Sequence, residues 1–134
     1  GRTEIPLNIL LVEDNEDNRL LIKSYLKKLP HAVEVAVNGK EAVDKVRAGR
    51  RYDIILMDVQ MPVMDGYEAT RHIRDWEADH AEKPAFIVAL TAHALREDEQ
   101  RSIDAGCNGH LTKPIKKQEF LSFLQETSRR IISG

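Results

Sequence analysis

The sequence predicts a single α/β domain in which helices cover both faces of a doubly wound, five-stranded parallel sheet. Short apolar runs rich in branched residues alternate five times with longer segments whose apolar positions repeat at helical spacing. The connections between these segments are only a few residues long. Because right-handed crossovers place each helix on a face of the sheet, this order of elements is typical of doubly wound folds. A length of 134 residues is enough for one such domain.

The first two strand and helix units carry clear boundary signals. Asn8–Val12 is a short apolar run that we expect to form a strand buried on both faces. Asn15 can cap the helix after it, and Pro30 is expected to stop that helix. Val33–Val37 is the second predicted strand, and a capping-box pattern that begins at Asn38 opens the second helix.

Three further units complete the predicted sheet. Ile54–Met57 is the third strand, and Asp65 with Gly66 forms the turn into its helix, because glycine permits a positive φ. Phe86–Leu90 is the fourth strand, and a charged, weakly amphipathic helix follows it. Gly109–Thr112 is the fifth strand, and the last helix after it has one apolar face.

Composition and charge exclude several classes of protein. Lys and Arg number 20 against 22 Asp and Glu, so no basic field exists to bind a nucleic-acid backbone directly. The longest apolar run is too short to insert into a membrane as a helix. Cys107 is the only cysteine, so no internal disulfide can form and a cytoplasmic location is expected. Residues 1–7 are interpreted as a leader or a cloning remnant, and residues 8–134 as the domain itself.

Polar and charged side chains gather at the carboxyl ends of the predicted strands. Glu13 and Asp14 follow the first strand, Asp58 the third, Thr91 the fourth and Lys113 the fifth. Open parallel sheets bind ligands at this edge. Clustered carboxylates repel one another unless a cation neutralises them, and an oxygen-lined site suits Mg²⁺. A lysine and a hydroxyl beside the metal suit phosphoryl oxygens, so the set predicts phosphoryl chemistry on a carboxylate.

Two observations bear on this interpretation of the strand ends. The chain contains no glycine-rich phosphate-binding motif, which excludes dinucleotide and P-loop chemistry. Taken singly, each acidic residue could be an ordinary helix cap or strand end. Taken together with Thr91 and Lys113 at the same edge, a shared chemical role is favoured over separate structural ones.

Four segments in order along the chain closely resemble the receiver domains of two-component response regulators. They are Leu11–Asn15, Met57–Gly66, Ala89–Ala92 and Leu111–Pro114. The resemblance spans about Asn8 to Ile131 and implies a flavodoxin-like sheet with strand order 2-1-3-4-5. The sequence around Asp58 and at Ala92–Ala94 is especially similar to receivers attached to hybrid histidine kinases.

The resemblance implies a role for each acidic residue of the cluster. Asp58 accepts a phosphoryl group from a phosphohistidine, reacting as an ordinarily ionised carboxylate. Asp14, Asp58 and the backbone carbonyl of Gln60 hold Mg²⁺, and Glu13 acts partly through water. The cofactor implied by the resemblance is therefore Mg²⁺ alone.

The resemblance also implies how the phosphoryl group is held and sensed. Lys113 and Thr91 bind its oxygens, and the peptide bond before Pro114 is typically cis. The family usually has a Tyr or Phe switch residue three positions before this lysine, and His110 stands there in this chain. Two roles stay open for His110: it fills the space that Thr91 frees on moving inward, or it is a strand residue without a switching role.

The implied partners follow from the same resemblance. The phosphodonor is a histidine kinase or a histidine phosphotransfer protein, and a fused or separate output module reads the phosphorylated state. Gln60 and His93 lie two residues after Asp58 and Thr91, so their side chains are expected to flank the phosphoryl group and tune its lifetime. The domain is expected to catalyse only its own phosphorylation and slow dephosphorylation.

Two other functions remain open on the sequence. A haloacid-dehalogenase-type phosphatase also uses an aspartate nucleophile, but it requires a second aspartate two residues later, where Gln60 stands. Turnover of a phosphomonoester would support that function. A flavin-binding module or a non-phosphorylated interaction module of the same fold is the other alternative, and a lack of Mg²⁺-dependent phosphorylation would favour it.

Overall fold

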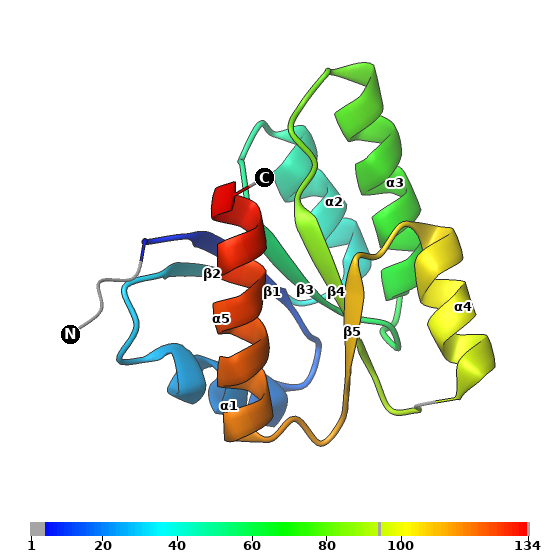
Figure 1. Cartoon of the computed structure of the whole chain (residues 1–134). Coiled ribbons are helices and arrows are strands. Elements are labelled where there is room, and N and C mark those ends of the chain that lie inside the picture. Colours follow the sequence, from blue (N-terminus) through cyan, green and yellow to red (C-terminus); the bar gives the residue numbers. More distant parts are fainter. Residues whose placement is uncertain (1–4, 94, 134) are drawn as a thin grey trace.

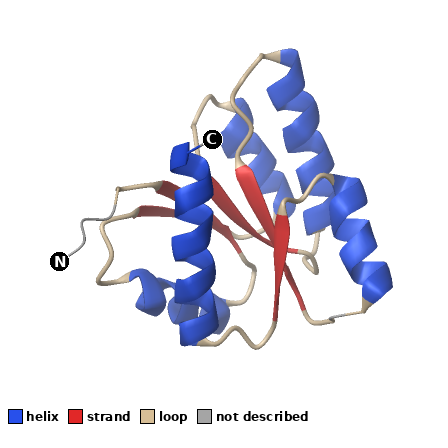
Figure 2. Ribbon diagram, in the orientation of Figure 1, coloured by secondary structure: helices blue, strands red, loops and turns tan. Residues whose placement is uncertain are grey.

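The chain alternates strands and helices throughout, as Figure 2 shows for the computed structural model, which describes residues 5–93 and 95–133. In chain order the elements are β1 Asn8–Val12, α1 Glu16–Leu26, β2 Ala32–Ala36, α2 Gly39–Arg47, β3 Ile54–Asp58, α3 Gly66–Asp79, β4 Phe86–Thr91, α4 Arg96–Ala105, β5 Gly109–Thr112 and α5 Lys117–Ser133. One parallel sheet has the order β2-β1-β3-β4-β5, with α1 and α5 on one face and α2, α3 and α4 on the other (Figure 1). The predicted doubly wound fold and its strand order are confirmed.

The strands begin and end within one residue of their expected positions. β1 and β5 have the expected bounds. β3 continues to Asp58 and β4 to Thr91, because these two residues still pair in register with β4 and β5. β2 lies one residue nearer the amino terminus than expected, because Ala32 pairs with Asn8 at the start of β1. Asp58 and Thr91 are therefore held by the sheet itself.

The ends of the helices follow local hydrogen bonding. The prediction that Pro30 stops α1 is wrong, since the helix ends at Leu26. The Leu29 N–H donates to the Leu26 carbonyl at 3.0 Å, a tighter turn than an α-helix allows. The caps expected at Asn15 and Asn38 are confirmed, because each side-chain oxygen accepts a backbone N–H from the first turn of its helix.

Two hydrophobic clusters fill the faces of the sheet. The cluster under α2 and α3 contains Leu10, Ile55 and Met57, whereas the cluster under α1 and α5 contains alternate strand residues and Phe120. Leu7, which the sequence analysis assigns to a leader, is 5% exposed and packs in the second cluster, so the packed part of the chain includes it. No helix among residues 5–93 and 95–133 combines the length and apolar composition needed to cross a membrane.

Gly66 brings the start of α3 close to the end of β3. The expectation of a positive φ at Gly66 is wrong, because the positive-φ glycines among the described residues are Gly49 and Gly106. A Cβ at Gly66 would lie 2.3 Å from the Asp58 carbonyl oxygen, closer than any real contact. Glycine is therefore required at this position for close packing rather than for turn geometry.

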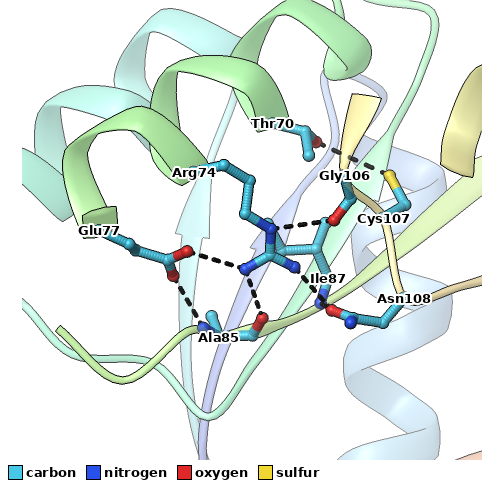
Figure 3. Close-up of polar contacts among 8 residues, drawn as sticks. All are labelled: Thr70, Arg74, Glu77, Ala85, Ile87, Gly106, Cys107 and Asn108. Carbon is cyan, nitrogen blue, oxygen red and sulfur yellow. Dashed lines mark hydrogen bonds and ion pairs between the residues drawn. The ribbon is translucent and has the colours of Figure 1, made fainter. Parts of the chain in front are cut away.

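Arg74 of α3 forms a polar clamp with Glu77 of the same helix and with three residues from neighbouring segments (Figure 3). Its guanidinium donates to the Gly106 carbonyl at 2.9 Å, to the Ala85 carbonyl and a Glu77 oxygen at 2.8 Å each, and to Asn108 Oδ1 at 2.7 Å. The other Glu77 oxygen accepts the Ala85 N–H at 2.8 Å. This Arg74 clamp ties α3 to the start of β4 and to the loop between α4 and β5.

Candidate phosphorylation site

The carboxyl ends of four strands form the candidate site. Glu13 directly follows β1, Asp58 ends β3, Thr91 ends β4 and Lys113 directly follows β5. Because all the strands run parallel, these ends share one edge of the sheet. α1 begins two residues after Asp14, which is exposed, whereas Glu13 is buried.

Three carboxylates lie close enough together to bind one metal ion. One oxygen each from Glu13, Asp14 and Asp58 lies within 4.8 Å of the other two. Glu13 is 1% exposed and Asp58 is 2% exposed, whereas Asp14 is exposed. The Asn15 N–H donates to a Glu13 oxygen at 3.2 Å, and this bond fixes the turn. The three carboxylates therefore offer a metal ion two buried oxygen ligands and one that faces solvent.

Lys113 bridges the two buried carboxylates. Its Nζ lies 3.1 Å from Glu13 Oε1 and 3.2 Å from Asp58 Oδ1. The Lys113 backbone N–H donates to the Thr91 carbonyl at 2.7 Å, and the bond to Pro114 is cis, as the resemblance implied. The ammonium is therefore positioned to neutralise charge in the centre of the site.

Burial and mutual repulsion shift the ionisation of this group. Burial, followed by the nearby Glu13 carboxyl, raises the pKa of Asp58 to about 7. Burial also acts to raise the pKa of Glu13, but bonds from Asp58 and Lys113 outweigh it and lower that pKa. The ion pairs raise the pKa of Lys113 despite its burial. Without metal, Asp58 is therefore harder to ionise than an ordinary aspartate.

Among the described residues, Thr91 hydrogen-bonds through its hydroxyl to His93 and not to Asp58. Its hydroxyl donates to the His93 carbonyl and accepts the His93 N–H, each at 3.1 Å. The Gln60 backbone N–H donates to Asp58 Oδ1 at 3.1 Å. Gln60, Thr91 and His93 line one cavity of about 470 Å³ beside the site, so the structure brings together the residues expected to flank a phosphoryl group.

His110 lies on β5 and is half-buried, in register with Ala89. Among the described residues, no hydrogen bond or ring contact joins His110 to Thr91. Its switching role therefore stays a prediction.

Tyr67 is a residue of this region that sequence reasoning missed. It is 5% exposed, and its hydroxyl donates to the Asp98 carbonyl at 3.4 Å and accepts from Ser102 Oγ at the same distance. The Arg101 guanidinium lies 4.8 Å from the centre of its ring. Tyr67 thus joins the start of α3 to α4 across the cavity. Its position directly after Gly66 is the one signal that the sequence offered.

An open parallel sheet with buried carboxylates after β1 and at the end of β3, bridged by a lysine after β5, defines the receiver class of α/β domains. The chain belongs to the response regulator receiver domain family, and the model of that family matches residues 9–125. It is therefore a receiver domain of two-component signalling.

Curated relatives of the chain include sensor proteins, hybrid histidine kinases and a response regulator. The chain is 40% identical over 111 residues to the sensor protein GacS of Pseudomonas syringae pv. syringae, a match that covers 83% of this chain and 12% of GacS. It is 46% identical over 121 residues to the hybrid signal transduction histidine kinase B of Dictyostelium discoideum, with 84% of this chain and 6% of that protein covered. The chain therefore spans only a small part of the length of these relatives.

Solved receiver structures superimpose closely on the chain. One is from the co-crystal structure of the Saccharomyces cerevisiae histidine phosphotransfer protein Ypd1 and the receiver domain of Ssk1, with a TM-score of 0.88, 34% identity, and 95% of this chain and 92% of that chain covered. Another is the receiver domain of the sensor histidine kinase PA1611 from Pseudomonas aeruginosa PAO1, which holds a magnesium ion in its active-site cleft. Its TM-score is 0.78, with 40% identity and coverage of 92% of this chain and 98% of that chain.

Proposed function

We propose that Asp58 is the phosphoacceptor of this receiver domain and that it takes its phosphoryl group from a phosphohistidine. The observation that carries the proposal is the Lys113 bridge between Glu13 and Asp58 at the carboxyl edge of the sheet. Asp58 is the carboxylate that ends a central strand, with the Gln60 N–H on one of its oxygens. Glu13 and Asp14 lie on the turn after β1, where they suit metal binding instead.

The donor set fits a Mg²⁺ ion. Asp14, Asp58 and the Gln60 carbonyl would hold it, and Glu13, already paired with Lys113, would contribute partly through water. All these donors are oxygen atoms, which Mg²⁺ prefers, and the exposed Asp14 leaves room for bound water. When bound, Mg²⁺ supplies positive charge to the phosphoryl oxygens and to the ionised form of Asp58.

The chain's own groups account for the transfer step. An Asp58 oxygen forms a bond to phosphorus while the phosphorus–nitrogen bond of the phosphohistidine breaks, and the imidazole leaves with that electron pair. The Lys113 ammonium binds one phosphoryl oxygen, and the Thr91 hydroxyl turns from His93 to donate to another. Gln60 and His93 border the path of an attacking water and set the lifetime of the product.

The surface beside the site suits a histidine-bearing partner. Leu20 on α1 is 57% exposed and Val63 in the β3–α3 loop is 77% exposed, so apolar side chains are presented on segments that flank the acidic turn. A histidine kinase or a histidine phosphotransfer protein can cover these side chains while its phosphohistidine reaches Asp58. A fused or separate output module then reads the phosphorylated form, with His110 as a candidate switch. A cytoplasmic setting is consistent with the lone Cys107.

The phosphatase alternative has little support at the site. Gln60 provides a backbone N–H to Asp58 where that class of enzyme has a second carboxylate. The family match and the Lys113 bridge both favour a phosphoacceptor over an enzyme with a separate substrate. A non-phosphorylated interaction module is tested directly by phosphorylation.

Intact-mass measurement after incubation with acetyl phosphate and Mg²⁺ tests the proposal. The unmodified chain should gain one phosphoryl group, Asp58→Asn should gain none, and the exposed control Asp75→Asn should behave as the unmodified chain. Asp14→Asn should show lower Mg²⁺ affinity by calorimetry and slower phosphorylation together. A persistent adduct in Asp58→Asn, or no adduct in any variant, would rule the proposal out.

A further inference from the structure

A second cavity lies at the amino-terminal edge of the sheet, opposite the edge that holds Asp58. Its volume is about 390 Å³, within the range of small-molecule sites. Apolar side chains from both layers of helices and from the sheet line it, among them Val46, Ile55, Trp76, Phe86 and Ile131. Nothing in the phosphorylation chemistry uses this cavity, because β3 begins here and ends at Asp58.

The carboxylates of the lining are all engaged by the protein. Glu77 accepts from Arg74 and from the Ala85 N–H. Glu82 lies 3.2 Å from Arg51, and Asp53 accepts the backbone N–H of the first residue of β1 at 2.8 Å. None of these acids is therefore left to attract a cationic ligand without losing a bond inside the protein.

One charged side chain of the lining has no partner within the described part of the chain. Among the described residues, Lys83 has neither an ion pair nor a side-chain hydrogen bond. The Tyr52 side chain also lines the cavity, but its hydroxyl is buried away from solvent beside Glu34 and Arg50, so it offers no bond to a ligand there. The nearby Glu34 carboxylate is engaged by Arg50. Burial, followed by Glu34, raises the pKa of Tyr52 to about 12, so this hydroxyl keeps its proton.

One wall of the cavity is held in place before any ligand binds. Glu77, Ala85 and Asn108 line it, and the Arg74 clamp bonds to all three (Figure 3). Side chains fixed by such bonds lose little further freedom when a ligand arrives, which lowers the entropic cost of binding.

We propose that this cavity binds a small aromatic carboxylate, with its apolar body against Trp76, Phe86 and Ile131 and its anionic end toward Lys83. The apolar lining favours a flat hydrocarbon body. The exposed Lys83 ammonium favours a carboxylate, because no acid among the described residues pairs with its charge. The site is independent of phosphorylation at Asp58.

Two matched probes test the charge preference on isotope-labelled protein. Naphthoate and naphthylmethylammonium share one ring system and differ in the sign of their charge. Trp76 is the only tryptophan, so its indole N–H signal in the nuclear magnetic resonance spectrum reports directly on the cavity. Naphthoate should shift this signal saturably and bind at least about three-fold more tightly than the cation, as one added ion pair allows.

Conservative variants locate the binding groups. Lys83→Gln should weaken naphthoate binding and reduce its advantage over the cation. Lys116→Gln removes an exposed lysine outside the cavity and should change neither. Overlaid amide spectra show that each variant is folded. Equal affinity for the two probes, absence of saturable shifts at Trp76, or equal losses in Lys116→Gln would each overturn the proposal.

Discussion

At the scale of single residues, the site is defined by two buried carboxylates that lie close together. Asp58 and Glu13 are both almost fully buried, and one Lys113 ammonium contacts both. One positive charge cannot fully offset two negative charges in a poorly solvated site, so the pKa of Asp58 rises to about 7 while that of Glu13 falls. A bound cation would release the Asp58 proton and leave Asp58 ready to attack phosphorus.

The raised pKa of Asp58 predicts how stability depends on pH without metal. The folded protein holds the Asp58 proton more tightly than the unfolded chain, so this contribution to stability is present at low pH and is lost as the pH rises through about 7. Asp58→Asn cannot lose that proton. Its gain in unfolding free energy over the unmodified chain should therefore grow by about 2 kcal/mol between about pH 5 and about pH 8.

Urea denaturation in a chelating buffer measures this difference. Asp75→Asn, which removes an exposed carboxylate of α3, is the control and should show no such trend. Parallel pH profiles for Asp58→Asn and the unmodified chain would contradict the raised pKa. Added Mg²⁺ should stabilise the unmodified chain more than Asp58→Asn at the upper pH.

At the scale of elements, the Arg74 clamp fixes the carboxyl end of α4 against α3. Glu77 is 7% exposed, so removing the guanidinium leaves a buried carboxylate without its cation. We expect Arg74→Met to lower the free energy of unfolding by about 3 kcal/mol. Arg74→Met combined with Glu77→Gln should recover part of this loss, because the buried charge is then absent.

A double-mutant cycle by urea denaturation checks the clamp. Arg71→Met, an exposed arginine on the same helix, is the matched control and should cost much less than Arg74→Met. Additive effects of the Arg74 and Glu77 substitutions would show that the two side chains are not energetically coupled.

The β3–α3 loop carries strain next to the site. Val63 has a φ of 71°, a left-handed conformation that branched side chains rarely adopt, yet its side chain is 77% exposed and gains little from packing. Such strain persists at functional positions. Val63→Asn should therefore raise the free energy of unfolding by about 0.5 kcal/mol and weaken binding of the phosphodonor, since asparagine tolerates this conformation but is polar.

Thermal unfolding together with a binding titration separates the two effects at Val63. Val37→Asn is the control, because Val37 is also exposed, at 40%, and is not among the described residues with a positive φ. A destabilised Val63→Asn, or one that binds the phosphodonor as tightly as the unmodified chain, would count against a functional origin of the strain.

At the scale of the whole molecule, two routes connect the site to α4 and β5. Thr91 ends β4 and is paired with β5, the strand that carries His110. Tyr67 instead links the start of α3 to α4 through its contacts with Asp98 and Ser102. Thr91 directly follows Leu90, the residue that pairs with Asp58 in the sheet. Tyr67 directly follows Gly66, which packs against the Asp58 carbonyl.

His110→Ala tests the first of these routes. If Thr91 moves inward on phosphorylation and His110 fills the space, the alanine variant should be phosphorylated at a near-normal rate. The difference in partner affinity between its two forms should nevertheless shrink several-fold, because coupling requires contacts that differ between the states. Partner titration with and without phosphorylation measures this, with Tyr67→Phe for comparison. An unchanged difference would make His110 a bystander.

The sequence by itself determined the strands, the caps at Asn15 and Asn38, and the grouping of polar residues at the strand ends. These features rest on signals that act within a few residues: apolar runs, capping side chains and polar strand ends. A parallel sheet then brings strand ends to one edge whatever the details of packing. This is why Glu13, Asp58 and Lys113 could be grouped before their distances were known.

Only the tertiary structure decided how strongly the site residues interact and which contacts form elsewhere in the fold. The raised pKa of Asp58 depends on burial and on the position of Glu13, forty-five residues earlier in the chain. The close approach at Gly66 and the Arg74 clamp depend on how α3 packs against β3, β4 and the loop before β5. Contacts between segments distant in the chain are set by register and packing of the whole core, which no local pattern specifies.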